Sequence, residues 1–333
     1  MLLTDLLQKL ATVKVLVIGD IMLDHYIWGD VQRISPEAPV PVVHVTRDTY
    51  TAGGAANVAL NLANLGVKTS ILGHCANDEA GKRLAEIFTA NSISQVLPIS
   101  DSKVPSIIKT RVIIRGQQLC RIDREASRDL YNVEINEKFE DLLEAAVADA
   151  DAIIISDYAK GVITQSLVSR LLNNPRHKNG SLLTAVDPKP ARRLNFNGIG
   201  LLTPNRNEAL ELAELPSYNP DVEYPLDEIC NSIHDKYDPR LLVVTLGAEG
   251  MAICKEGEVI KKLPTEARQV FDVSGAGDTV IAILTASLAA GATPFDAATL
   301  ANIAAGCVVS HMGTAPITLA ELTESVHHFS INK

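Results

Sequence analysis

A run of eight residues near the C-terminal end of the chain, 272–279 (Asp-Val-Ser-Gly-Ala-Gly-Asp-Thr), contains the residue types that bind and transfer an anionic group. Gly275 and Gly277 allow a tight turn with exposed backbone N–H groups, and the apolar run 280–284 predicts a buried helix that begins there. Because a helix N-terminus has unpaired N–H groups and a partial positive charge, it attracts anions, phosphate above all. The segment therefore predicts a phosphate-binding turn.

Asp278 lies inside this turn, where a carboxylate would repel the anion unless it takes part in the chemistry. It is placed to accept a proton from a hydroxyl group that attacks a phosphoryl group. The alternative is an ordinary N-cap of the following helix.

Upstream, residues 53–59 (Gly-Gly-Ala-Ala-Asn-Val-Ala) predict a second glycine turn that enters a small-residue helix. Asn57 can face a ligand there, or the stretch can serve helix packing alone.

The composition is that of a globular protein with a large core. The 333 residues are 47% hydrophobic and 21% charged, enough for one large or two medium domains. A net charge of −10 disfavours a nucleic-acid binder or a binder of anionic membranes, because both partners attract basic surfaces. The most apolar run, 280–292, is too short to cross a bilayer, and the N-terminus lacks the features of a secretory signal.

The cysteines are scattered, odd in number and without a Cys-x-x-Cys pair. This pattern favours reduced thiols in the cytoplasm over a disulfide framework or a zinc site. The five are Cys75, Cys120, Cys230, Cys254 and Cys307.

Apolar strand-like runs alternate along the chain with helix-like segments, which predicts an α/β fold. Because the runs are continuous rather than alternating, they suit strands covered on both faces, in a doubly wound, mostly parallel sheet. The predicted strands are 15–18, 69–72, 152–155, 182–186, 201–203 and 241–245, and the predicted helices include 55–65 and 79–90. Polar residues follow several of these strands, where such sheets bind ligands, namely Asp20, Asp157, Asp187 and Asn205.

Two segments break the alternation and predict a small β lid. Residues 36–45 read as a strand that its prolines confine to a sheet edge, and residues 107–115 read as a second strand outside the main sheet. We expect lid strands at approximately 26–46 and 107–122, inserted in a single domain that spans 1–333.

The two glycine segments resemble the two signatures of the ribokinase-type (PfkB) carbohydrate kinases, and this resemblance covers essentially the whole chain. It implies a ribokinase-like fold and the transfer of a phosphoryl group from ATP to a sugar. Five segments resemble, more narrowly, the D-glycero-β-D-manno-heptose-7-phosphate kinases of this family: 19–24, 33–42, 117–118, 156–161 and 202–205. These enzymes phosphorylate the anomeric C1 hydroxyl to give the 1,7-bisphosphate, in ADP-heptose and lipopolysaccharide core biosynthesis.

Many kinases of this group are fused to a nucleotidyltransferase domain that carries a His-x-Gly-His motif. That motif does not occur in this sequence, so the sequence resembles the stand-alone kinase.

The resemblance implies roles for the residues that match. Asp278 corresponds to the catalytic base, and the amides of Gly275, Ala276 and Gly277 to the anion hole. Sugar hydroxyls are expected at Asp24, Gly53, Gly54 and Asn57, with Asp20 and Asp157 as further candidates.

The cofactors implied are ATP and magnesium. Glu208, which ends an Asn-x-x-Glu motif, is expected to hold Mg²⁺ through water, the alternative being a solvated carboxylate at a helix start. ATP is expected near Lys189, Asn205, Thr245, Gly247, Gly250 and Asn302. The alternatives are a solvated Lys189, a plain turn at 245–250 and a helix-packing hydrogen bond at Asn302. Several members also bind potassium near the equivalents of Asp272 and of 306–313, so K⁺ is a further candidate.

A phosphorylated sugar is favoured by basic residues in the lid, because a buried phosphate needs guanidinium or ammonium partners. These are Arg33, Lys109, Arg111, Arg115 and Arg121. Arg111 is the leading candidate, since strand alternation turns one face toward the cleft, and a solvated strand arginine is its alternative.

Two rival functions remain at this point. One is a kinase of the same family for ribose, a ketohexose phosphate or a nucleoside. The other is a catalytically inactive sugar or nucleotide sensor, against which the presence of Asp278 argues, since a sensor would not need the base. Family members often dimerise through the lid, which implies a homodimer.

Overall fold

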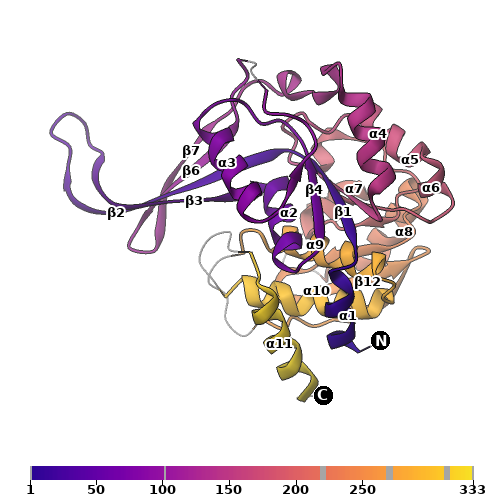
Figure 1. Cartoon of the computed structure of the whole chain (residues 1–333). Coiled ribbons are helices and arrows are strands. Elements are labelled where there is room, and N and C mark those ends of the chain that lie inside the picture. The colour runs from indigo at the N-terminus through magenta and orange to yellow at the C-terminus, as the bar shows by residue number, and fades with distance from the viewer. Residues whose placement is uncertain (1, 101–102, 218–222, 268–272, 311–315, 332–333) are drawn as a thin grey trace.

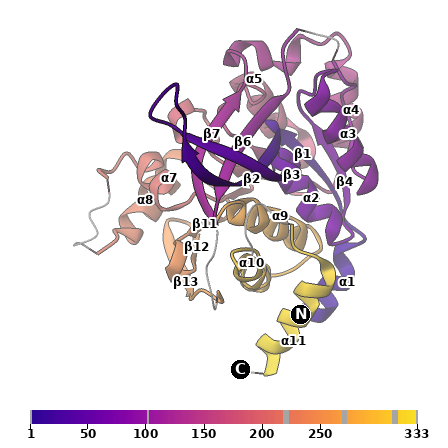
Figure 2. The same cartoon turned by 90° about the vertical axis from the view of Figure 1, so that its left-hand side faces the viewer.

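The computed structural model describes residues 2–100, 103–217, 223–267, 273–310 and 316–331. A nine-stranded sheet forms the body, and a four-stranded sheet projects from it (Figures 1 and 2). In spatial order the large sheet contains β13 (Glu258–Leu263), β12 (Met251–Lys255), β11 (Leu242–Thr245), β10 (Leu201–Leu202), β9 (Leu183–Asp187), β8 (Ala152–Ser156), β1 (Lys14–Gly19), β4 (Lys68–Leu72) and β5 (Ser94–Gln95).

The strands from β11 to β5 pair in parallel, whereas β12 and β13 add an antiparallel hairpin at one edge. All five residues of β8 are buried, as a central strand covered on both faces requires. The predicted α/β class is confirmed. The antiparallel hairpin of β12 and β13 was not predicted from the sequence.

Helices cover both faces of the large sheet. They are α1 (Leu3–Leu10), α2 (Ala55–Asn64), α3 (Glu79–Ala90), α4 (Phe139–Asp149), α5 (Gln165–Asn173), α6 (Pro175–Lys178), α7 (Arg206–Leu212), α8 (Leu226–Tyr237), α9 (Ala276–Ala289), α10 (Pro294–Val308) and α11 (Leu319–Ile331). Short 3₁₀ turns are η1 (Arg128–Tyr131), η2 (Val133–Ile135), η3 (Pro190–Arg192) and η4 (Gly247–Glu249).

Alternate residues of each strand enter two separate cores. Val15 and Val17 of β1 join the core under α1, α2, α3, α9, α10 and α11, whereas Leu16 and Ile18 join the core under α4, α5, α7 and α8. This division follows from the two-residue period of a strand.

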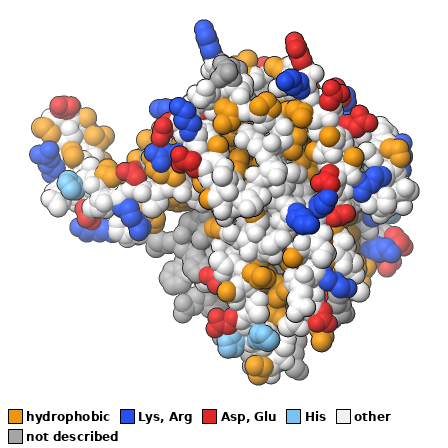
Figure 3. All heavy atoms as spheres, in the orientation of Figure 1, with side chains coloured by type: hydrophobic (Ala, Val, Ile, Leu, Met, Phe, Trp, Pro, Cys, Tyr) orange, Lys and Arg blue, Asp and Glu red, His pale blue; other side chains and the backbone are white. Residues whose placement is uncertain are grey.

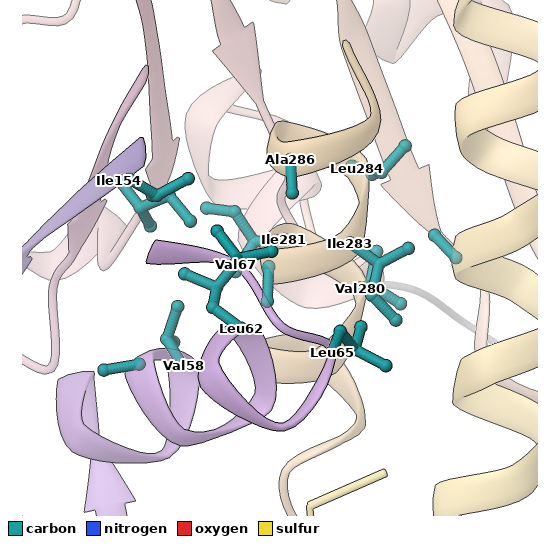
Figure 4. Close-up of a cluster of buried hydrophobic side chains, with 14 of the residues drawn as sticks. Val58, Leu62, Leu65, Val67, Ile154, Val280, Ile281, Ile283, Leu284 and Ala286 are labelled. Atoms are coloured by element: carbon teal, nitrogen blue, oxygen red, sulfur yellow. The ribbon is translucent and has the colours of Figure 1, made fainter. Parts of the chain in front are cut away.

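Helices α2 and α9 pack side by side in the first core, and Figure 4 shows their side chains gathered there. Val58, Leu62 and Ile281 are completely buried. Because both helices begin at the same end of this contact, the packing brings Asn57 of α2 close to Asp278 of α9. The apolar cluster thus fixes the geometry of polar groups at the helix starts.

The small sheet has the order β3 (Pro41–Gly54), β2 (Ile21–Ile34), β6 (Ile107–Ile114) and β7 (Gln117–Arg124). The β2–β3 hairpin projects as a long arm in Figure 1. The strand expected over 36–45 begins only at Pro41, because Pro36 and Pro39 lie in the hairpin turn. Among the described helices, none combines the length and apolarity needed to cross a membrane.

Candidate functional site

Asp278 is 4% exposed and lies in the first turn of α9. Its carboxylate accepts two short hydrogen bonds, from Nδ2 of Asn57 at 2.7 Å and from the hydroxyl of Tyr158 at 2.6 Å. The alternative role as a helix N-cap is therefore wrong, since Gly275 is the N-cap residue and neither bond of Asp278 goes to the helix backbone. Burial, above all, raises the pKa of Asp278 to about 6, against the lowering effect of Tyr158 and Asn57.

The two glycines of the turn before Asp278 differ in backbone conformation and surroundings. Gly275 has φ of +82°, a left-handed conformation that other residues rarely adopt. At Gly277 a Cβ would meet no atom within 4 Å, so the backbone there borders open space. The amide of Ala276 donates to the carbonyl of Val273 at 3.3 Å, which leaves Gly275 and Gly277 as the donors to consider for an anion. Asp272 lies outside the described residues.

Asp24 of β2 faces this site from the lid. It forms an ion pair with Arg111 of β6, in which the guanidinium Nη1 meets the carboxylate. A Cβ on Gly53 would lie 2.5 Å from Asp24 Oδ2, so only glycine lets β3 pass this carboxylate. Gly54 has φ of +57° and forms the N-cap of α2. The structure therefore brings Asp24, Gly53, Gly54 and Asn57 together, as expected from the sequence.

Asp20 has a different place from the one expected. It is completely buried, and its carboxylate accepts from the backbone N–H groups of Tyr158, Lys160 and Val162 at 2.9, 3.0 and 3.1 Å. An oxygen pair engaged by three amides and shielded from solvent holds a loop, not a sugar hydroxyl. The expectation of a sugar-binding Asp20 is corrected on this ground.

Asp157, next to this loop, is 2% exposed. Its Oδ1 accepts from the N–H of Ala159 at 2.8 Å, whereas the buried Oδ2 has no hydrogen-bond partner in the described part of the chain. Burial first, and then the charge of Asp20, raises the pKa of Asp157 to about 6. Asp157 thus keeps one free acceptor at the strand end.

The residues expected to meet magnesium and the phosphates of ATP are paired with each other. Lys189 Nζ lies 2.8 Å from Glu208 Oε1, and Glu208 Oε2 accepts from the N–H of Asn205 at 3.0 Å. Asn205 in turn caps α7, so it forms a capping box with Glu208. Burial, followed by the charges of Glu208 and Asp278, raises the pKa of Asp187 well above its usual range. A row of carboxyl groups therefore borders this edge.

No direct metal cage exists within the described ranges, where no three His, Cys, Asp or Glu side chains are grouped to hold an ion. Both oxygens of Glu208 already have protein partners. These donors fit a magnesium ion that keeps its water shell and is carried by phosphates, and they do not fit one bound directly by carboxylates.

The expected nucleotide-side residues follow β10 and β11. Thr245 and Asn205 form an isolated parallel bridge, which brings the ends of these strands together. Gly247 has φ of +62° with open space where a Cβ would project, whereas a Cβ on Gly250 would lie 2.0 Å from the carbonyl oxygen of Leu263. Gly247 therefore borders open space, and Gly250 is required by the close approach of β13.

Two residues that were expected to bind ligands lie elsewhere or have other partners. Asn302 of α10 donates from Nδ2 to the carbonyl of Pro264 at 2.6 Å, which is the helix-packing alternative. Arg33 is exposed near the end of β2, on the projecting arm, and is not brought to Asp278.

Three of the basic residues of the lid lie on one face of its strands, whereas Arg115 lies in a turn. Strand register places Arg121 opposite Arg111, with Lys109 two residues earlier on the same face. Arg121 pairs with Asp123 at 2.9 Å, so of these three only Lys109 makes no ion pair with the described residues. Arg115 lies in the β6–β7 turn, with φ of +49°. The cationic face is therefore Lys109, Arg111 and Arg121.

The positions of Tyr158 and Lys109 near Asp278 were not predicted from the sequence. Lys109 Nζ lies 5.3 Å from the ring centroid of Tyr158, and its charge lowers the pKa of Asp278. Tyr158 follows Asp157 directly, and a polar residue one position beyond a strand-end carboxylate was the signal available in the sequence.

Comparison with known proteins shows the family to which the chain is similar. The profile of pfkB family carbohydrate kinases matches residues 12–320. The bifunctional protein HldE of Pelobacter propionicus is 39% identical over 322 residues, which are 97% of this chain and 65% of that protein. The chain spans less than two thirds of the length of the curated relatives it matches.

Solved structures show the same fold. Arabidopsis thaliana ribokinase, in complex with ribose and ATP, has a TM-score of 0.69 at 19% identity, covering 94% of this chain and 98% of that one. Phosphofructokinase-2 from Escherichia coli, in complex with potassium, has a TM-score of 0.75 at 19% identity, covering 96% and 99%. The ribokinase-like architecture is thereby confirmed.

Proposed function

Because the chain belongs to the pfkB family of carbohydrate kinases, we propose that it transfers the γ-phosphoryl group of ATP to the C1 hydroxyl of D-glycero-β-D-manno-heptose 7-phosphate. The product is the 1,7-bisphosphate, a precursor for ADP-heptose and the lipopolysaccharide core. The observation that carries the reaction type is the carboxylate of Asp278, held by Asn57 and Tyr158 at the start of α9. The heptose is supported by the HldE relatives at about 40% identity.

Asp278 is the general base of the proposed reaction. With a pKa of about 6 it is mostly ionised at neutral pH, yet it is far more basic than an exposed aspartate. It accepts the proton of the C1 hydroxyl as that oxygen attacks the γ-phosphorus. The amides of Gly275 and Gly277 then donate to the equatorial oxygens of the transferred group, where positioning and charge supply most of the catalysis.

Cations must offset the carboxyl groups along this edge. The carboxylates of Glu208 and Asp278, which raise the pKa of the neighbouring Asp187, would repel a triphosphate. Magnesium bound to ATP neutralises part of that charge, with Glu208 placed to hold one of its waters. Lys189 adds a positive charge beside Glu208. Potassium is a further proposed cofactor, although Asp272 and 311–313 lie outside the described residues.

The lid supplies the other cations. Lys109 and Arg111 lie on the face of β6 that carries the contacts to Tyr158 and Asp24. We assign them to the 7-phosphate, which the carboxyl groups of the sheet edge would otherwise repel. Closure of the lid over the sugar would exclude water and so prevent hydrolysis of ATP.

The enzyme is proposed to act as a homodimer joined through the lid, in the cytoplasm. The lid exposes several apolar side chains that a monomer would leave in water, namely Ile34, Val40 and Val45 of the β2–β3 arm and Leu119 and Ile122 of β7. The cytoplasm fits an ATP-dependent reaction and five cysteines that are all free thiols.

A panel of phosphorylated and free sugars tests the proposal. Each sugar is incubated with Mg²⁺ and ATP, ADP release is followed in a coupled assay, and the product is identified by mass spectrometry. We expect turnover with heptose 7-phosphate to exceed that with ribose, fructose 6-phosphate and nucleosides. Faster turnover of another sugar would reassign the substrate. If no sugar in the panel led to ADP release, the inactive sensor would be favoured.

A further inference from the structure

The contact between Tyr158 and Asp278 is a feature of the site to which the family resemblance gave no role. The phenol donates to Asp278 Oδ1 at 2.6 Å, while Asn57 donates to the other oxygen, Oδ2. We infer that Tyr158 is a positioning residue for the catalytic base, whose hydroxyl fixes the orientation of the Asp278 carboxylate and stabilises its ionised form. This inference rests on the proposed function.

The backbone around Tyr158 is built to hold that side chain in place. Its own N–H donates to Asp20 Oδ2, and two further amides of residues 157–162, here called the Tyr158 loop, donate to the same carboxylate. Asp20 is completely buried at the end of β1, so the loop is tied to the centre of the sheet. A buried carboxyl group that accepts hydrogen bonds from three backbone amides is a rigid anchor.

The Tyr158 loop also contains two residues with positive φ. Ala159 has φ of +58°, which is uncommon for a residue with a Cβ. Gly161 has φ of +125°, and a Cβ there would lie 2.1 Å from the carbonyl oxygen of Arg128. An ion pair of Lys160 with Glu125, at 2.6 Å, closes the outer side of the loop. These features together direct the Tyr158 ring toward α9.

The tyrosine acts only as a donor. Burial, followed by the charge of Asp278, raises the pKa of Tyr158 well above its ordinary value, so the phenol keeps its proton at neutral pH. Its hydrogen bond lowers the pKa of Asp278, as does that of Asn57. The other charged groups near Asp278 are Asp24, which raises its pKa, Lys109, which lowers it, and Asp187.

Tyr158→Phe removes the hydroxyl and keeps the ring. We expect kcat to fall about tenfold to a hundredfold, the range for a hydrogen bond to a charged group, with KM for ATP unchanged. Because the variant loses a donor to the ionised carboxylate, the acidic limb of the kcat–pH profile should move to higher pH. Tyr131→Phe is the matched control, since among the described residues the Tyr131 hydroxyl bonds to backbone groups of Ala126 and Pro105 and not to a carboxylate.

A second measurement does not depend on the sugar. The protein is labelled with carbon-13 at the aspartate carboxyl carbons, the Asp278 signal is assigned by its loss in Asp278→Asn, and its pKa is read by NMR titration. We expect a higher pKa in Tyr158→Phe than in the wild type, and no change in Tyr131→Phe. An equal pKa in the wild type and Tyr158→Phe overturns the inference, whichever sugar is phosphorylated. A raised pKa without heptose phosphorylation would refute only the proposed substrate.

Discussion

Asp278 is held in its ionised form by few groups. Burial raises its pKa, and two neutral donors together with Lys109 offset part of that effect. The result is a carboxylate with a pKa of about 6. A general base is most effective when its pKa lies near the pH at which the enzyme works, and this value is close to neutral pH. Because only the ionised form accepts a proton, kcat of the wild type should fall as the pH decreases through about 6.

Asp278→Asn tests the base directly. Asparagine keeps the volume and one acceptor but cannot take a proton, so we expect kcat to fall by roughly 10²–10⁴-fold with ATP affinity almost unchanged. Turnover is measured in the coupled assay and ATP affinity by calorimetry. Wild-type turnover in this variant would remove Asp278 from the role of base.

Arg111→Ala tests whether Arg111 binds the phosphate group of the sugar. Loss of a charged hydrogen bond of about 1.5–3 kcal/mol predicts that KM for the phosphorylated heptose rises by one or two orders of magnitude, with KM for ATP unchanged. Since Arg111 also pairs with Asp24, the unphosphorylated sugar is measured in parallel.

Two further variants sharpen this comparison. Lys109→Ala should raise the same KM, because Lys109 has no ion pair with the described residues that would compete for its charge. Arg47→Ala, a second lid arginine stacked on Trp28 at 4.8 Å, should leave it unchanged. Equal losses for both sugars in Arg111→Ala would show that this arginine supports the lid and does not bind the phosphate.

At the scale of elements, strands and helix starts were predictable from local pattern. Continuous apolar runs located β1, β8 and β11, and the paired glycines located the starts of α2 and α9. The extent of the lid was not predictable, because long antiparallel strands such as β2 and β3 owe their length to each other across the hairpin. A local window of sequence does not record how far the pairing of two strands extends.

The same limit applies to the site. Asp278, Asn57 and Asp24 were found because they stand in recognisable segments. The hydrogen bonds from three backbone amides to Asp20, and the ion pair of Lys189 with Glu208, join residues that are far apart in the sequence. Residue type alone therefore identified the carboxylates but not their partners.

Glu208→Gln tests the magnesium role without breaking α7. Glutamine can keep the capping box with Asn205, so the helix should remain folded. Removal of the charge should raise the Mg²⁺ concentration needed for half-maximal rate, with KM for the sugar little changed. Asn205→Ala is the comparison for a lost cap, at about 1 kcal/mol of stability. An unchanged magnesium titration in Glu208→Gln would exclude this glutamate from the metal site.

At the scale of the whole molecule, the arm calls for a partner surface. Figure 3 shows apolar side chains on the projecting part of the lid, which in a monomer would face water. A closed, two-fold contact between two lids would bury them.

Replacement of Ile122, which is 58% exposed on β7, by Glu should convert the dimer to a monomer. Light scattering after size exclusion measures the mass. Ile260→Glu is the matched control, since Ile260 is also 58% exposed but lies on β13, away from the lid. A monomeric wild type, or a variant that stays dimeric, would refute the lid contact.

The position of β1 has a consequence for synthesis on the ribosome. β1 ends at residue 19 and pairs on one side with β4, but its other neighbour, β8, begins at residue 152. At about 5–20 residues per second, the nascent chain carries an unpaired apolar strand edge for on the order of ten seconds. Such an edge can recruit other chains. Yield in the cell should therefore depend on chaperones that shield nascent chains more than on the stability of the finished fold.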